Sequence, residues 1–120
     1  MLKHSHKFVS KSWGSELWIV NKPAYCGKIL TLEKGKASSI HRHILKDETM
    51  LVFDGKLRIE TWEYIKEGKT LGKQKKYTLR KGNSLHIPAN LWHRFTGIAD
   101  RTTIIEFSTH HQETDVVRLN

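Results

Sequence analysis

Four residues of the types that bind metal ions are spaced so that β-structure would bring them together. His41 and His43 are two positions apart, so on a strand both side chains leave the same face. Glu48 follows a polar turn at Lys46-Asp47, opens the next apolar run and can point back toward the two imidazoles. His93 offers a fourth ligand further along the chain. Three imidazoles and a carboxylate suit first-row divalent metals and can leave coordination positions open.

The segments around these residues are predicted to be short strands. Runs such as 27–32, 49–53 and 102–108 are rich in β-branched and apolar residues and are separated by turn residues. Asp54-Gly55 is a strong hairpin signal, and the long segment 56–81 is predicted to be a protruding hairpin. No helical periodicity extends beyond a turn or two. Many short strands between turns favour an all-β sandwich or barrel.

The spacing resembles the first sequence motif of the cupin superfamily. That motif is Gly, five residues, His-x-His, three or four residues, Glu, six residues, Gly, and the chain meets every fixed position. The matching residues are Gly35, His41, His43, Glu48 and Gly55. The resemblance implies a cupin double-stranded β-helix, which is a jelly-roll barrel. It also implies one divalent transition metal held by His41, His43, Glu48 and His93, with Zn, Mn, Fe, Ni and Co all remaining open.

The second cupin motif is met in part. Gly82, Pro88 and His93 stand at their expected positions, whereas Asn90 replaces a glycine and Gly97 replaces an asparagine. Because Asn also adopts the left-handed backbone conformation, Asn90 is a mild departure. Gly97 removes a side chain that helps to shape the end of the barrel.

A narrower resemblance is to the C-terminal cupin domain of type II mannose-6-phosphate isomerases. It is carried by Ser12-Trp13-Gly14-Ser15-Glu16-Leu17, by segment 38–43, and by the closing Glu113-Thr114-Asp115-Val116-Val117-Arg118, and it covers roughly residues 11–120. It implies aldose–ketose isomerisation of a sugar or sugar phosphate. In such a reaction a metal can stabilise an enediolate while a carboxylate or imidazole moves the proton.

Five further residues are candidates for this chemistry. Glu106 and His86 are candidate bases, although Glu106 could be an outward-facing strand residue and His86 a packed histidine. Arg118, Lys28 and Arg94 are candidates for binding substrate oxygens or a phosphate. For Arg118 and Lys28 the alternative is a position on the surface.

Two other functions compete with isomerisation. The same three-histidine, one-glutamate set supports the O₂ chemistry of a non-haem metal dioxygenase or related oxidative lyase. A non-enzymatic sugar-binding module is the second alternative. Metal content and oxygen uptake would separate the isomerase from the dioxygenase.

The 120-residue chain is long enough for one domain, and we expect residues 11–120 to form it. Residues 1–10 are expected to be loose or paired with a partner subunit. Cys26 lies in an apolar run and is expected to be a buried, unreactive thiol. We expect a cytoplasmic protein that makes no membrane contact. A homodimer is also expected, because a jelly roll leaves strand edges to be covered, and the aromatic segment from Phe8 to Trp18 is the candidate contact.

The net charge of +9 permits two interpretations. Nucleic acid is disfavoured because the basic residues are scattered, and because their densest cluster, between Lys66 and Lys81, is typical of a solvated hairpin edge. A positive field that attracts an anionic small substrate fits the isomerase prediction.

Overall fold

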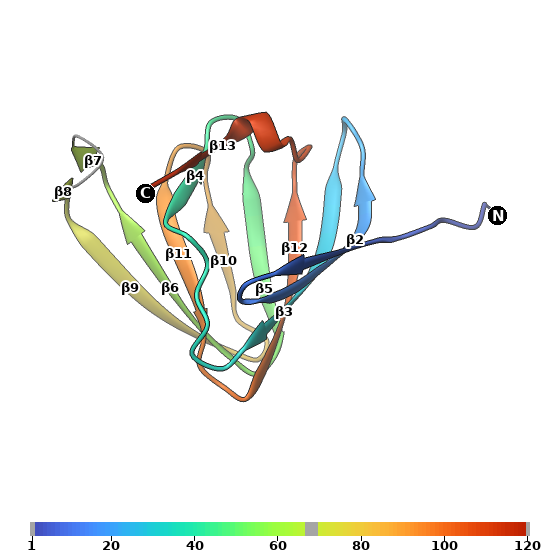
Figure 1. Cartoon of the computed structure of the whole chain (residues 1–120), viewed down its shortest axis with the longest axis horizontal. Coiled ribbons are helices and arrows are strands. Elements are labelled where there is room, and N and C mark those ends of the chain that lie inside the picture. Colours follow the sequence, from blue (N-terminus) through green and yellow to red (C-terminus); the bar gives the residue numbers. More distant parts are fainter. Residues whose placement is uncertain (1, 67–69, 120) are drawn as a thin grey trace.

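The computed structural model describes residues 2–66 and 70–119, which fold into two antiparallel sheets that face each other (Figure 1). In sheet order, the six-stranded sheet consists of β1 (Lys7–Lys11), β2 (Gly14–Asn21), β3 (Cys26–Glu33), β12 (Arg101–Ser108), β5 (Glu48–Asp54) and β10 (Ser84–Ile87). The five-stranded sheet consists of β13 (Val116–Arg118), β4 (His41–His43), β11 (Trp92–Gly97), β6 (Lys56–Trp62) and β9 (Gln74–Arg80). Two short strands, β7 (Ile65–Lys66) and β8 (Thr70–Leu71), form a separate pair, and a 3-10 turn, η1 (Glu113–Asp115), precedes β13.

Strand alternation gives each sheet one inner and one outer face. In β3 the residues Lys28, Leu30 and Leu32 are buried, while the residues between them are partly exposed. β5 and β12 alternate in the same way. The inner residues of both sheets form one core that includes Leu32, Val52 and other apolar side chains.

The inner face changes from charged to apolar along three neighbouring strands. In β3, Lys28 is followed on the same face by Leu30 and then Leu32. The strand β12 runs the other way, and its Glu106 lies directly opposite Lys28. On the inner face of β5, the buried Glu48 is followed by Met50 and then by Val52. One end of the sandwich is therefore closed by apolar side chains, and the charged side chains gather at the other end.

Two tight turns depend on a left-handed backbone. Gly55 has φ of 91°, and an added Cβ would lie 2.6 Å from the carbonyl oxygen of Arg101. Asn90, which replaces the glycine of the second motif, has φ of 70°. The expectation that Asn could take this conformation is therefore confirmed.

The all-β jelly-roll prediction is confirmed, with changes at Asp54-Gly55 and near the N-terminus. The hairpin prediction at Asp54-Gly55 is wrong, because this turn joins β5 to β6, which lie in different sheets. Segment 56–81 contains the predicted hairpin, formed by β6 and β9, and its residues 67–69 lie outside the described part of the chain. Residues 7–10 are not loose, because they belong to β1, which pairs with β2 from Lys7–Trp18 to Lys11–Gly14. The physical reason is that an extended chain with Phe8 and Val9 satisfies its backbone on the free edge of β2. Residues 2–6 have no regular secondary structure.

Candidate metal centre and pocket

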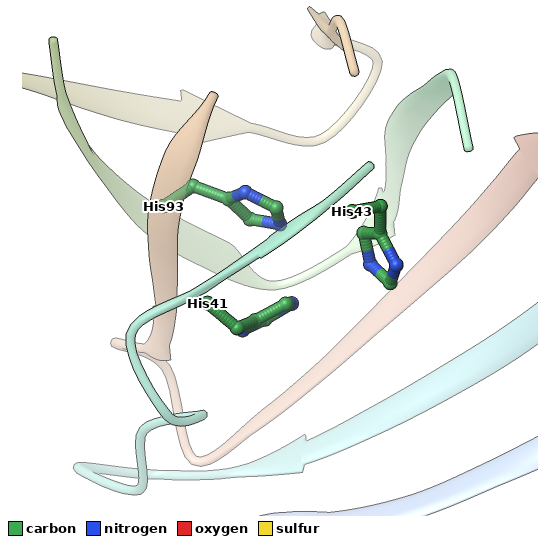
Figure 2. A group of neighbouring side chains, drawn as sticks. All are labelled: His41, His43 and His93. Atoms are coloured by element: carbon green, nitrogen blue, oxygen red, sulfur yellow. The ribbon is translucent and has the colours of Figure 1, made fainter. Parts of the chain in front are cut away.

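Three of the four predicted metal ligands meet at the charged end of the sandwich. His41 and His43 come from β4 and His93 from β11, and His41 pairs directly with His93 in the sheet. Figure 2 shows the three imidazole rings around a common space, and one ligand nitrogen from each lies within 4.8 Å of the others. The strand period of two places His41 and His43 together, and the antiparallel register adds His93.

The backbone fixes which nitrogen of two of these histidines faces the cluster. His41 Nδ1 lies 2.9 Å from the carbonyl oxygen of Ser39, and His93 Nδ1 lies 2.9 Å from that of Leu91. Since a carbonyl oxygen only accepts, each Nδ1 donates, and in a neutral imidazole ring of this tautomer Nε2 carries the lone pair. His93 Nε2 is buried and has no hydrogen-bond partner among the described residues. A carbonyl behind each ring is the arrangement found behind metal-binding histidines.

Glu48 lies beside the three histidines and is almost fully buried. Its Oε1 is 3.5 Å from His93 Nε2, and its Oε2 is 3.7 Å from His43 Nε2. Burial opposes its charge, but the contact with His93 and the charge of Lys46 hold its pKa below the ordinary value. Burial and neighbouring cationic groups lower the pKa of His41 and His43 to about 3. Neutral imidazoles, an ionised carboxylate and an unpartnered buried nitrogen fit a divalent metal ion.

Lys46 is a central residue of this pocket that was predicted only as part of a turn. It is 3% exposed, and its Nζ lies 3.1 Å from Glu48 Oε2, 2.9 Å from Glu106 Oε2 and 3.3 Å from His111 Nδ1. The Lys46 ammonium therefore contacts two carboxylates and one imidazole nitrogen. Burial opposes the charge, yet Glu106 and Glu48 raise the pKa of Lys46 above its usual value. The available signal was its spacing of two from Glu48, which places both on one face of an extended chain.

Glu106 and Lys28 form the opposite wall of the pocket. Glu106 is 4% exposed, so the outward-facing alternative is wrong, and Lys28 is 2% exposed rather than on the surface. Burial and the charge of Glu48 raise the pKa of Glu106, against the opposing effect of Lys46 and Lys28. Burial lowers the pKa of Lys28, whose Nζ lies 3.6 Å from Glu16 and 4.1 Å from the centre of the Trp18 ring. The wall thus carries a carboxyl group whose proton affinity is increased.

Arg118 also lines the pocket, near its mouth. Its Nη2 lies 3.5 Å from Glu113 Oε2, while Glu113 Oε1 lies 3.0 Å from His111 Nε2. The hydrogen bond with His111 lowers the pKa of Glu113 to about 2. Because His111 Nδ1 also contacts Lys46, a chain of polar contacts runs from Arg118 at the mouth to Glu48 beside the histidines. His110 and His111 both follow β12. His111 lines the pocket, whereas His110 does not.

The cavity has a volume of about 250 Å³, and its charged side chains balance. The basic members are Lys11, Lys28, Lys46 and Arg118, and the acidic members are Glu16, Glu48, Glu106 and Glu113. The net charge of +9 therefore does not originate in the pocket. Pockets for drug-sized ligands are typically ~300–1,000 Å³, so a cavity of this size suits a small metabolite.

Two candidate site residues lie outside the pocket. His86 is exposed on β10 and lies 2.6 Å from Asp47, so its assignment as a base is wrong for this geometry. Arg94 is next to His93 on β11 and therefore points to the outer face, where its Nη2 lies 2.9 Å from Glu60. Strand alternation excludes both residues from the interior, because their neighbours Ile87 and His93 occupy the inner face. Cys26 is buried as expected, and burial raises its pKa.

The fold and the site together define a β-sandwich protein with a histidine cluster that can hold a metal ion at the open end of its interior. A model of the cupin domain matches residues 28–107, and the chain belongs to the cupin domain family. No curated protein matches the sequence. None of the helices in the described residues has the length and apolar character needed to cross a membrane.

Three solved structures illustrate the similarity of fold. The capsular polysaccharide assembling protein CapF from Staphylococcus aureus aligns with 98% of this chain and 35% of its own, at a TM-score of 0.80 and 18% identity. KdgF from Halomonas sp. aligns with 92% of this chain and 90% of its own, at a TM-score of 0.72 and 14% identity. Oxalate decarboxylase from Bacillus subtilis aligns with 97% of this chain and 30% of its own, at a TM-score of 0.76 and 14% identity. The chain spans about a third of the length of CapF, and at these identities the likeness shows the fold alone.

Proposed function

We propose that this cupin is a metal-dependent aldose–ketose isomerase that acts on a small anionic sugar such as a sugar phosphate. The observation that carries the proposal is the position of Glu106. This buried carboxyl group lines the same cavity as His41 and His43, and Lys46 joins it to Glu48 through contacts of 2.9 and 3.1 Å. The resemblance of residues 11–120 to type II mannose-6-phosphate isomerases supports the same reaction.

His41, His43, His93 and Glu48 would hold the metal ion. A bound divalent ion would supply polarisation of a carbonyl oxygen and of the neighbouring hydroxyl oxygen. The metal ion can be Zn, Mn, Fe, Ni or Co, since each accepts imidazole and carboxylate ligands.

Glu106 would move the proton between the two adjacent carbons of the sugar. Lys46 and Ser108 both contact its Oε2, at 2.9 and 3.3 Å. The other oxygen, Oε1, would therefore take the proton from one carbon and return it to the next. A raised pKa suits this exchange, because the carboxyl group must bind and release a proton in the same turnover.

The charge balance of the pocket favours an anionic substrate. The lining side chains sum to zero when all are ionised, so a divalent ion would leave the cavity positive. A phosphate or carboxylate on the sugar would compensate that charge, and Arg118 at the mouth offers a planar donor for it. Arg118→Ala should therefore weaken the preference for sugar phosphates over free sugars more than Lys75→Ala, which removes an exposed charge from β9. Equal effects would reduce Arg118 to one surface charge among many.

The deciding experiment uses the metal-loaded protein and a set of aldose and ketose phosphates in D₂O. Isomerisation through Glu106 should transfer deuterium from solvent to the sugar carbon next to the carbonyl. Glu106→Gln should abolish both the isomerisation and the exchange while still binding metal. Failure of every sugar phosphate to exchange or isomerise would overturn the proposal, and oxygen uptake in its place would establish the dioxygenase.

A further inference from the structure

The outer face of the six-stranded sheet presents a continuous apolar surface. Five residues from neighbouring strands pair directly with one another across it, from Phe8 on β1 through Leu17, Ile29 and Ile105 to Leu51 on β5. Strand alternation places Phe53 and Phe107 on the same face, because Val52 and Glu106 beside them are buried. We call this surface the apolar face, and its members are Phe8, Leu17, Ile29, Leu51, Phe53, Ile105 and Phe107.

The exposed area of the apolar face is large for a protein surface that meets only water. Phe8, Phe53 and Phe107 are 68%, 57% and 55% exposed. With roughly 200 Å² for each phenylalanine, these three side chains alone expose about 350 Å². Contiguous apolar patches of several hundred Å² mark interaction sites. A standard interface buries about 800 Å² on each partner, so the three rings would supply a little under half of it, and the partly exposed aliphatic side chains between them add to that area.

Charge is distributed unequally between the two outer faces. The positions between the members of the apolar face are mostly Thr, Ser and Gly. Charged and titratable side chains lie at its margins, where Glu33 pairs with Arg101, Asp54 pairs with Thr103, and His86 contacts Asp47. The outer face of the five-stranded sheet carries one carboxylate, Glu60, against six basic side chains. By strand register these are Arg42, Lys56, Arg58, Lys76, Arg80 and Arg94. Six of the 21 basic residues, which are scattered in the sequence, thus gather on the side opposite the apolar face.

We propose that two copies of this chain pack against each other through their apolar faces and form a two-fold symmetric dimer. A second copy fits this surface because an apolar, uncharged sheet face is complementary to itself. This arrangement also directs the two basic faces outward, which keeps the like charges of two +9 chains far apart. The contact centres on β3 and β12 and includes Phe8 and Leu17 from the segment Phe8 to Trp18, whereas Trp13 of that segment is 6% exposed and faces the interior.

Sedimentation velocity over a range of micromolar concentrations tests this dimer with the full-length chain. The wild type should have about twice the mass of the 14.0 kDa chain. Ile105→Lys should give the mass of one chain, because two lysines would meet at the centre of the interface without water. Thr78→Lys is the matched control, since it adds the same charge to the outer face of β9 and should leave the dimer unchanged.

A second variant protects the test against loss of folding. Phe107→Ser alters a side chain that is 55% exposed in the single chain, so the fold should persist while the mass falls to that of one copy. Far-ultraviolet circular dichroism and the thermal midpoint of each variant verify the fold. A monomeric wild type, or a dimer that survives both Ile105→Lys and Phe107→Ser, would overturn the proposal. Because mass is the readout, the result does not depend on isomerase activity.

Discussion

Replacing Lys46 with methionine should strongly destabilise the protein. Methionine has nearly the length of lysine, so the change removes the charge with little loss of volume. Glu48 and Glu106, which are 2% and 4% exposed, would then face each other without the ammonium that contacts both. Removal of one partner from a buried ion pair costs about 3–5 kcal/mol. For a domain of this size the thermal midpoint should fall by roughly 10–20 °C.

The loss should depend on pH in a defined direction. Burial and Glu48 already raise the pKa of Glu106, and removal of Lys46 would raise it further. A carboxyl group whose pKa is higher in the fold than in the unfolded chain contributes stability below the unfolded pKa, near 4.3, and loses it as pH rises through the folded pKa. The deficit of Lys46→Met should therefore be larger at neutral pH than at pH near 5.

Urea unfolding followed by tryptophan fluorescence, with EDTA present, measures these free energies. Lys46→Met combined with Glu106→Gln should recover part of the loss, because one of the two unpaired carboxylates is gone. Lys36→Met removes an exposed lysine and should change the free energy of unfolding by less than about 0.5 kcal/mol. A loss below about 1 kcal/mol for Lys46→Met, or no recovery in the double variant, would refute the reasoning.

Three further predictions concern metal binding, acid stability and a turn. His41→Ala with His43→Ala should abolish stoichiometric metal binding in calorimetry, whereas His4→Ala with His6→Ala, in the exposed N-terminal segment, should not. The pKa of His41 and His43 is about 3 in the fold, against ~6.5 in an unfolded chain. Unfolding therefore binds protons, so stability should fall as pH drops from about 6.5 toward 3, and the double His41/His43 variant should flatten this fall. Gly55→Ala should cost at least about 1 kcal/mol in urea unfolding, because its Cβ would lie 2.6 Å from a carbonyl oxygen; unchanged stability would contradict the turn geometry.

The histidine cluster and the fold class were predictable from the sequence because their signals are local. A spacing of two places His41 and His43 on one face of any strand, and Gly55 and Asn90 mark turns that require a left-handed backbone. The strand runs in segment 56–81 predicted the hairpin of β6 and β9. The turn at Asp54-Gly55 instead joins β5 to β6, which belong to different sheets. Strand alternation also places Arg94, the residue after His93 in β11, on the other face of the sheet, and this signal could have excluded Arg94 from the pocket.

Which face of a sheet is covered, and which end of the sandwich stays open, was decided only by the tertiary structure. The sequence shows Lys46 as part of a polar turn and Glu106 as a break in an apolar run, and neither pattern reveals burial. Both become buried because β5 and β12 are neighbours and bring Glu48, Glu106 and Lys46 to the same end of the sandwich. Six basic residues gather on one outer face for the same reason, since antiparallel register joins positions that lie far apart in the chain. Side-chain period is a property of a single strand, whereas burial and charge clustering arise from the pairing of strands and the packing of sheets.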